Sequence, residues 1–216
     1  MTMNYYITGY CSIRNQVAMV DDRLEHYEEN FYTFADLVKS LYKKEEISYP
    51  KFFKMDGLSK LGFLTAEMLL KRKEKGKYQG PRVGMILSNS ASSLDTDLAF
   101  HETIRDRQQY FPSPSVFVYT LPNIVIGEIC IRNKFKGENT FLISEKFDSG
   151  LLYTNIREAL DHGRMDVCIG GWIDLLRERY ESLLFIVEKE TNVSPEPEHK
   201  KVEFCPGEIE KLYLKI

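Results

Sequence analysis

Hydrophobic positions gather in five short runs along the chain, and these runs predict buried β-strands. Each run is rich in apolar, β-branched or aromatic residues and is bounded by Gly, Pro or polar clusters. The predicted strands cover residues 4–13, 82–88, 139–144, 166–172 and 182–189. The run at 82–88 is almost continuously apolar, as expected for a strand covered on both faces of an α/β sheet.

Between these runs, apolar residues recur every three or four positions and predict helices. The strongest case follows Lys54, where Leu58, Leu61 and Met68 recur at helical spacing and either Asp56 or Ser59 is suited to cap the start. Further helices are predicted over residues 34–42, 95–105 and 151–161, with Asp95 and Asp97 as candidate caps.

A long apolar stretch, residues 116–131, predicts a buried helix. Pro122 interrupts or kinks it, because proline lacks the backbone N–H that a helix interior requires. The charged and Pro-containing segment 191–201 predicts a surface loop, and residues 202–216 predict a last strand because their end alternates weakly. Together these elements predict one layered α/β domain over residues 1–216 with a mixed five-stranded sheet.

Composition and charge argue against two classes of function, nucleic-acid binding and insertion into a membrane. The chain has 216 residues, a formal net charge of -3 and a pI near 5.9, which predicts no general attraction to nucleic acid. The basic run at 71–77 is interpreted as a solvated helix end. No apolar segment reaches the ~20 residues of a membrane helix, and the amino terminus has no leader pattern. We therefore expect a cytoplasmic protein without a membrane partner.

The four cysteines are Cys11, Cys130, Cys168 and Cys205, and no two of them form a CxxC pair. This spacing predicts reduced thiols and no metal site. The hydroxyl-rich loop at 88–93 lacks the spacing of a P-loop. We interpret it as a loop that caps the next helix, and no cofactor is predicted.

Five segments resemble, in order and spacing, the amino-terminal half of the β-ketoacyl-acyl-carrier-protein synthases, which are condensing enzymes of the thiolase-like superfamily. The segments are residues 5–13, 54–70, 82–100, 114–144 and 157–176. The resemblance spans about residues 3–190 and implies a thiolase-like half. It leaves 191–216 as a loop and a terminal strand.

The resemblance implies a nucleophilic cysteine at the start of the helix that follows the strand at 139–144. In this chain the position falls on Lys146, with Glu145 and Phe147 on either side. A lysine opposes the dipole at a helix amino terminus and does not replace a thiolate. We interpret Lys146 and Asp148 as a salt bridge at the helix start rather than as a catalytic pair.

A complete synthase of this family has two similar halves, and the second half supplies a pair of histidines. The four histidines here, His26, His101, His162 and His199, lie at no position where that pair would occur. A single half is also expected to expose one apolar face of its sheet. This predicts pairing with a second copy or with a different subunit.

These features suggest a non-catalytic accessory subunit, similar to a chain length factor, in fatty acid or polyketide-type biosynthesis. Its implied partners are acyl carrier protein and a catalytically competent condensing subunit. Candidate acyl or thioester contacts are Ser92, Ser93, Lys146 and Asp148. One alternative is an independent acyl-thioester transferase that uses Ser92, Ser93 or Cys168, although Cys168 lies mid-strand, where a buried inert thiol is usual. Another alternative is a homodimer that binds thioesters or carrier protein.

Overall fold

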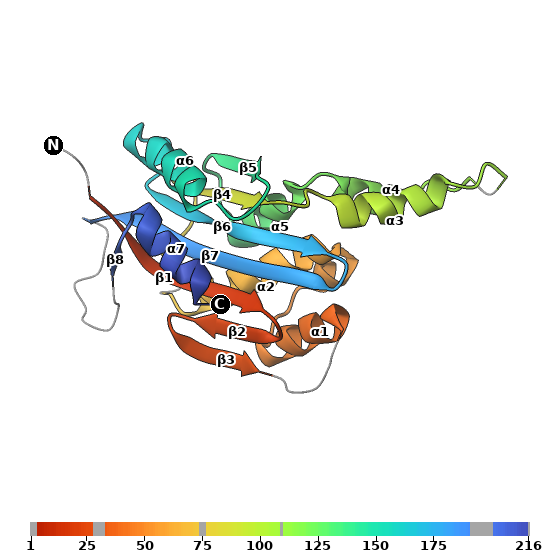
Figure 1. The fold of residues 1–216 in the computed structure, drawn as a ribbon, viewed down its shortest axis with the longest axis horizontal. Coiled ribbons are helices and arrows are strands. Elements are labelled where there is room, and N and C mark those ends of the chain that lie inside the picture. Colours follow the sequence, from red (N-terminus) through yellow and green to blue (C-terminus); the bar gives the residue numbers. More distant parts are fainter. Residues whose placement is uncertain (1–3, 28–32, 74–76, 109, 191–200, 216) are drawn as a thin grey trace.

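The chain folds into three layers, with one central sheet between two layers of helices (Figure 1). The computed structural model describes residues 4–27, 33–73, 77–108, 110–190 and 201–215. The predicted surface loop at 191–201 and His199 therefore lie almost entirely outside the described residues, as does part of the basic run at 71–77. The layered α/β arrangement agrees with the prediction from the sequence.

The sheet has eight strands rather than the predicted five, in the order β3-β2-β1-β7-β6-β4-β5, with β8 paired to β1. The strands are β1 (Tyr5–Arg14), β2 (Val17–Val20), β3 (Arg23–Tyr27), β4 (Val83–Asn89), β5 (Asn139–Ile143), β6 (Val167–Leu176), β7 (Arg179–Lys189) and β8 (Val202–Glu203). Only β4 pairs in parallel, with β5 and β6, so the sheet is mixed. The prediction missed the β2–β3 hairpin because its short strands alternate polar and apolar residues irregularly.

Strands β6 and β7 form a long hairpin in the middle of the sheet, and two glycines let other elements approach β6. A Cβ atom on Gly171 would lie 2.0 Å from the carbonyl oxygen of Leu183 on β7. A Cβ atom on Gly170 would lie 2.3 Å from Ile156 on the covering helix. Close packing of the strands and the helix therefore explains both glycines.

Three helices, α1 (Phe34–Lys44), α2 (Gly57–Lys71) and α5 (Ile124–Asn133), contribute to the larger of two hydrophobic clusters, on one face of the sheet. The short η1 (Pro50–Lys54) connects α1 to α2. The side chain of Asp56 caps α2 by accepting a hydrogen bond from the Ser59 N–H over 2.9 Å. Of the two residues that the sequence suggested as caps, Asp56 is therefore the one that caps α2.

The opposite face is covered by α6 (Ser149–Asp161) and α7 (Pro206–Leu214), which contribute to the second cluster. Two expectations are wrong here. Residues 206–214 form a helix rather than a strand, because Ile209 and Leu212, spaced for one helix face, are buried in that cluster. This face of the sheet is also not left open, since α7 lies beside α6 and closes it.

An arm projects from one end of the sheet (Figure 1). It consists of α3 (Leu94–Ile104), α4 (Pro114–Phe117) and η2 (Val118–Thr120). Pro122 interrupts the apolar stretch as predicted, and the segments on its two sides meet at a bend of 97°. Asp95 and Asp97 lie in the first turn of α3 rather than capping it, because the N-cap residue is Ser93.

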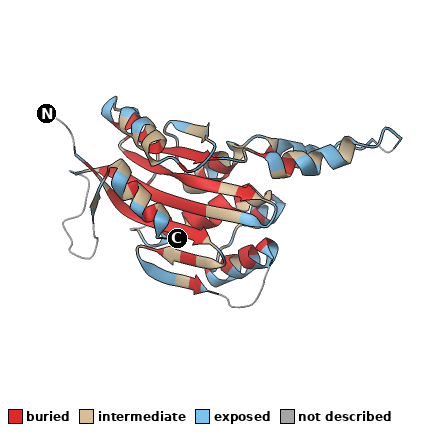
Figure 2. Ribbon diagram, in the orientation of Figure 1, coloured by how far each residue is buried: buried red, intermediate tan, exposed pale blue. Residues whose placement is uncertain are grey.

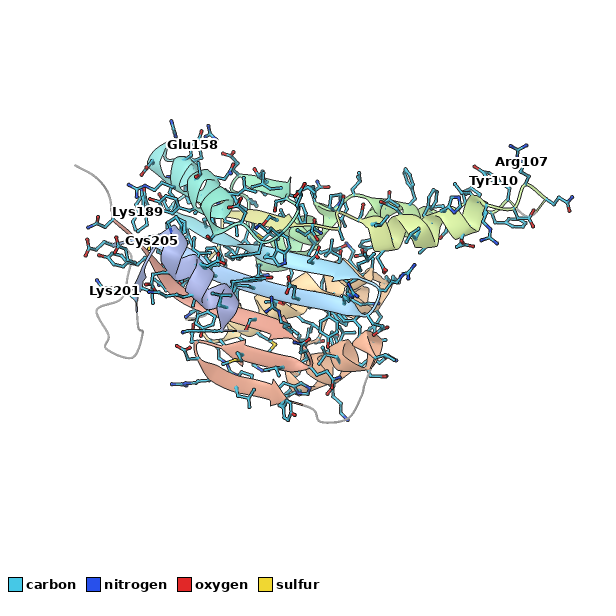
Figure 3. All side chains as sticks on the ribbon, viewed as in Figure 1. Arg107, Tyr110, Glu158, Lys189, Lys201 and Cys205 are labelled. Atoms are coloured by element: carbon cyan, nitrogen blue, oxygen red, sulfur yellow. The ribbon has the colours of Figure 1, made fainter. Side chains whose placement is uncertain are left out.

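The arm is mostly exposed, in contrast to the strands (Figure 2). Thr96 is the buried residue of α3, and α4 buries none of its residues. Several large apolar side chains on the arm and its flanks are exposed: Leu94, Leu98, Tyr110, Phe111, Phe117, Val118 and Leu121. Tyr110 and Arg107 lie at its tip (Figure 3). Within the described chain, no single helix is long and apolar enough to cross a membrane. The two helical segments on either side of Pro122 reach that length and apolarity only when they are counted together across their bend.

Candidate functional site

Strands β4, β5 and β6 run in parallel, so their carboxyl ends lie at the same edge of the sheet. The loop after β4 and the loop between β5 and α6 therefore meet there. The Ser144 N–H donates to the Asn89 carbonyl over 3.0 Å and joins the two loops. In α/β folds this edge is the usual place for a functional site.

The amino terminus of α6 is capped by Asp148, whose carboxylate accepts a hydrogen bond from the Leu151 N–H over 2.8 Å. A carboxylate at this position interacts favourably with the helix dipole and satisfies a free N–H group. Lys146 is exposed, and its backbone carbonyl accepts a hydrogen bond from the Ser144 hydroxyl over 2.8 Å. The expected salt bridge between Lys146 and Asp148 does not form, because Asp148 turns to the helix instead.

Phe147, between those two residues, points into the protein. Its ring stacks on Tyr213 of α7, with centroids 3.9 Å apart and planes at 6°. It also meets the edge of Trp172 on β6 at 5.9 Å and 84°. Phe147, the residue before the helix cap, thus packs against two other rings. The three residues Phe147, Trp172 and Tyr213 are called the aromatic cluster below.

Glu181 on β7 holds this aromatic cluster in place. Its carboxylate accepts hydrogen bonds from Trp172 Nε1 over 2.8 Å and from the Tyr213 hydroxyl over 3.0 Å. It also forms an ion pair with Arg14, whose guanidinium lies 4.6 Å from the centroid of the Tyr213 ring. Burial, followed by the nearby Glu181 charge, raises the pKa of Tyr213. Sequence reasoning missed this cluster because its three members come from three distant segments.

The hydroxyl-rich loop after β4 is held by its own polar groups. The Asn89 side chain forms two hydrogen bonds with the backbone of Ser92. It accepts from the Ser92 N–H over 3.0 Å and donates to the Ser92 carbonyl over 2.9 Å. Ser93 is buried, and its hydroxyl donates to the Thr120 carbonyl over 2.8 Å. Asp174 accepts hydrogen bonds from the Ser90 N–H and hydroxyl over 3.0 and 2.8 Å. The structure thus places Ser92 and Ser93 at the same end of the parallel strands as Lys146. Their loop is held in its conformation by these hydrogen bonds.

The cysteines and histidines assemble no catalytic group among the described residues. Burial raises the pKa of the Cys11 and Cys168 thiols well above their ordinary value, and it raises that of Cys130 to about 11. Cys205 starts α7 at the end of the molecule away from the arm (Figure 3). His26 is buried on β3, whereas His101 and His162 are exposed on α3 and at the end of α6. In the described ranges, no cluster of three potential metal ligands occurs.

A groove of about 570 Å³ lies beside Glu181, between the β1–β2 turn and the β6–β7 hairpin. Its lining is mostly polar or charged: Arg14, Asn15, Gln16, Asp174, Glu178, Arg179, Tyr180 and Glu181. Such a lining suits water or a polar group better than an acyl chain.

No protein-family profile matches the sequence, and no curated protein sequence matches it. The fold is similar to solved structures of condensing enzymes. The ishigamide ketosynthase/chain length factor matches with a TM-score of 0.68 and 14% identity over 88% of this chain and 63% of that one. A chain in the structure of the ketosynthase ApeO in complex with its chain length factor ApeC, from Xenorhabdus doucetiae, matches with a TM-score of 0.55 and 11% identity, over 87% of this chain and 79% of that one.

A β-ketoacyl synthase from Burkholderia phymatum matches with a TM-score of 0.59 and 10% identity, over 88% of this chain and 60% of that one. The chain thus spans less than two thirds of the length of two of these three proteins. At such low identity the comparisons show a shared thiolase-like fold. This agrees with the family resemblance read from the sequence.

Proposed function

We propose that this chain is a non-catalytic, synthase-like accessory subunit in acyl-chain biosynthesis of the fatty acid or polyketide type. In this role it works beside a catalytically competent condensing subunit and acyl carrier protein, as a chain length factor does. The similarity of its fold to ketosynthases and chain length factors supports the class of pathway. A cytoplasmic location is part of the same proposal.

The observation that carries the proposal is the start of α6, where the family resemblance implies a cysteine. Catalytic thiols at such positions are activated by free backbone N–H groups and the helix dipole. Here the Asp148 carboxylate takes up the Leu151 N–H and places a negative charge at the helix end. Of the preceding residues, Phe147 is buried and Lys146 is exposed. The local chemistry therefore offers neither a thiol nor an environment that would activate one.

The other candidate nucleophiles support the same conclusion. The Ser93 hydroxyl is buried and donates to the Thr120 carbonyl over 2.8 Å, so it is not open to a substrate even though the Asp97 carboxylate lies 3.2 Å away. The Cys168 thiol is fully buried and has a raised pKa. Ser92 is held by Asn89 through its backbone groups, and no general base contacts its hydroxyl in the described structure. A stand-alone acyl-thioester transferase would need a nucleophile that is both exposed to substrate and within hydrogen-bond reach of a base, and none of these three residues meets both conditions.

Reconstitution tests the proposal. A competent condensing enzyme of the same source, acyl carrier protein and malonyl-loaded carrier protein would be incubated with and without this chain. The product chain lengths would then be measured by mass spectrometry. We expect the chain to change the amount or length distribution of products at a one-to-one ratio. Unchanged products at every ratio would overturn the accessory role.

A matched pair of variants sharpens this test. Phe111 on the arm is 77% exposed and suits contact with another protein, whereas Leu214 at the end of α7 is 70% exposed on a different part of the molecule. Phe111→Asp is expected to weaken the effect on the products, and Leu214→Asp to leave it unchanged. Equal effects of the two substitutions would argue against a role for the arm.

A further inference from the structure

The groove beside Glu181 is lined by polar side chains from three neighbouring strands. Arg14 on β1 lies directly opposite Glu181 on β7, and Glu181 lies directly opposite Asp174 on β6. Arg179 is two residues from Glu181 along β7, so it lies on the same face of the sheet. The turn between β6 and β7 is at the end of the sheet from which the arm projects (Figure 1). The volume of the groove, about 570 Å³, falls within the range of roughly 300–1,000 Å³ that is usual for small-molecule sites.

Several polar groups of this groove have hydrogen-bonding capacity to spare. The Arg179 guanidinium is exposed and forms no ion pair or hydrogen bond within the part of the chain that the structure describes. The same holds for the side-chain amide of Asn15, judged among the described residues. Glu178 uses Oε2 to accept a hydrogen bond from the Phe34 N–H over 2.9 Å, which leaves its Oε1 for another donor. The groove therefore offers both donors and acceptors to a ligand.

This mixture indicates the chemical class of the ligand. A guanidinium group only donates hydrogen bonds and a carboxylate only accepts them, whereas a hydroxyl group does both. A molecule with several hydroxyl groups can thus bond to every kind of polar group in the groove. The lining holds three carboxylates and two guanidinium groups, so neither an anion nor a cation would meet opposite charge alone. A neutral ligand with many hydroxyl groups fits this lining best.

Apolar and aromatic ligands fit the groove less well. Tyr180 supplies the one aromatic ring among the described residues that line it, and this ring packs against Phe34 with centroids 5.0 Å apart. The Tyr180 hydroxyl accepts a hydrogen bond from the Gln16 N–H over 3.1 Å. The same described lining contains no aliphatic side chain. An acyl chain would therefore lack an apolar wall, and a flat heterocycle would lack a free ring on which to stack.

We propose that this groove binds a neutral, polyhydroxylated small molecule about the size of a monosaccharide. Arg179 and Asn15 donate hydrogen bonds to its hydroxyl oxygens, and the Glu178 carboxylate accepts from its hydroxyl groups. Such a ligand needs neither a thiol nor a carrier protein. The proposal therefore goes beyond the accessory role and does not depend on it.

Trp172 provides a built-in reporter for this site. It is the single tryptophan of the chain, and its Nε1 donates to the Glu181 carboxylate in the wall of the groove over 2.8 Å. Trp172 is itself buried, so a ligand would act on it through Glu181 rather than by contact. A ligand that bonds to Glu181 changes the polarity around the indole ring and hence its emission. Fluorescence titration therefore measures binding, and isothermal titration calorimetry checks it independently.

Titration of the full chain with D-glucose, D-galactose and D-mannose tests the proposal. We expect at least one of these sugars to bind with a dissociation constant of roughly 1 mM, as suits a ligand of so few atoms. Arg179→Ala removes a charged donor and is expected to raise this constant about tenfold. Asn15→Gly is expected to weaken binding similarly, because it removes the amide while glycine tolerates the φ of 49° at this turn.

Arg177→Ala is the matched control. Arg177 lies in the same turn as Arg179, is also exposed and does not line the groove, so its replacement should leave the dissociation constant unchanged. Urea unfolding midpoints equal to that of the wild type show that the variants are folded. D-glucuronate, which adds a carboxylate to the glucose ring, is expected to bind more weakly than glucose because three carboxylates line the groove.

Each outcome supports or overturns the proposal. Binding that is weakened in Arg179→Ala and Asn15→Gly but kept in Arg177→Ala supports it. No response to any of the three neutral sugars up to about 50 mM overturns it. Binding that persists in both groove variants overturns the groove as the site, and tighter binding of glucuronate than of glucose overturns the neutral class of ligand. None of these measurements uses carrier protein or a condensing enzyme, so this proposal and the proposed function can fail separately.

Discussion

The Asp148 carboxylate accepts a hydrogen bond from the Leu151 N–H over 2.8 Å and so occupies the amino terminus of α6. A helix terminus that serves a catalytic thiolate needs its N–H groups and positive dipole end for the anion formed on the thiol. In this chain the Asp148 carboxylate instead interacts with the N–H group and with the positive end of the helix dipole. The helix start is therefore suited to stability rather than to activating a nucleophile.

Removing this cap should weaken the fold. Asp148→Ala loses the hydrogen bond to Leu151 and is expected to lower the free energy of unfolding by about 1 kcal/mol. Asp148→Asn keeps an acceptor and should lose less. Urea unfolding followed by far-UV circular dichroism measures both. Equal stability of Asp148→Ala and the wild type would show that the cap contributes nothing.

A thiol placed at Lys146 should behave as an ordinary surface cysteine. Lys146 is exposed and lies two residues before the Asp148 charge. The iodoacetamide reaction of Lys146→Cys, followed at that residue by peptide mass spectrometry, is expected to show a midpoint near the usual thiol pKa of about 8.5. Lys146→Ala controls for reaction at other cysteines. A midpoint below about 7.5 would mean that the helix start does activate a thiol.

The aromatic cluster should contribute strongly to stability. Phe147 is 8% exposed and is stacked on Tyr213. Phe147→Ala is expected to lower the free energy of unfolding by about 3–5 kcal/mol and to change the emission of the single tryptophan, Trp172, which it contacts. Phe117→Ala, on the arm and 58% exposed, is the control and should change stability by about 0.5 kcal/mol or less. Similar losses in the two variants would contradict the packing described.

Cys130 should make stability depend on pH in the alkaline range. Burial raises the pKa of its thiol from 9.0 to about 11, so the folded state holds the proton more tightly than the unfolded state. The contribution is present below pH 9 and is lost as pH rises toward about 11. Urea unfolding at several pH values should therefore show a steeper loss in the wild type than in Cys130→Ala. The other buried thiols and tyrosines are common to both proteins, so parallel losses would contradict the raised pKa.

The sequence predicted the elements whose patterns are local. The helix start at Asp56 and the interruption at Pro122 each depend on residues near in sequence, and the structure confirms them. The β2–β3 hairpin was missed because its strands are short. Helix α7 was read as a strand because its few apolar residues suit either period, and packing against α6 and the sheet decides between them.

In the candidate site, too, the sequence predicted the local features and missed those that depend on distant segments. The position of Lys146 and Asp148 before a helix followed from the local pattern, but the direction of the Asp148 side chain did not. The enclosure of Phe147 depends on Tyr213, which lies in the terminal helix, and on Glu181 from β7. Such contacts between distant segments leave no periodic signal in the sequence. They explain why the closed face was not foreseen.

The most direct test of the central claim is an elongation assay with the purified chain alone. Acyl-loaded and malonyl-loaded carrier proteins would be incubated with the chain, and both the products and the intact protein mass would be measured. A competent condensing enzyme serves as the positive control. We predict no elongated product and no acyl adduct on the chain. An elongated acyl thioester, or an acyl adduct on Lys146, Ser92, Ser93 or a cysteine, would contradict the account of a non-catalytic subunit.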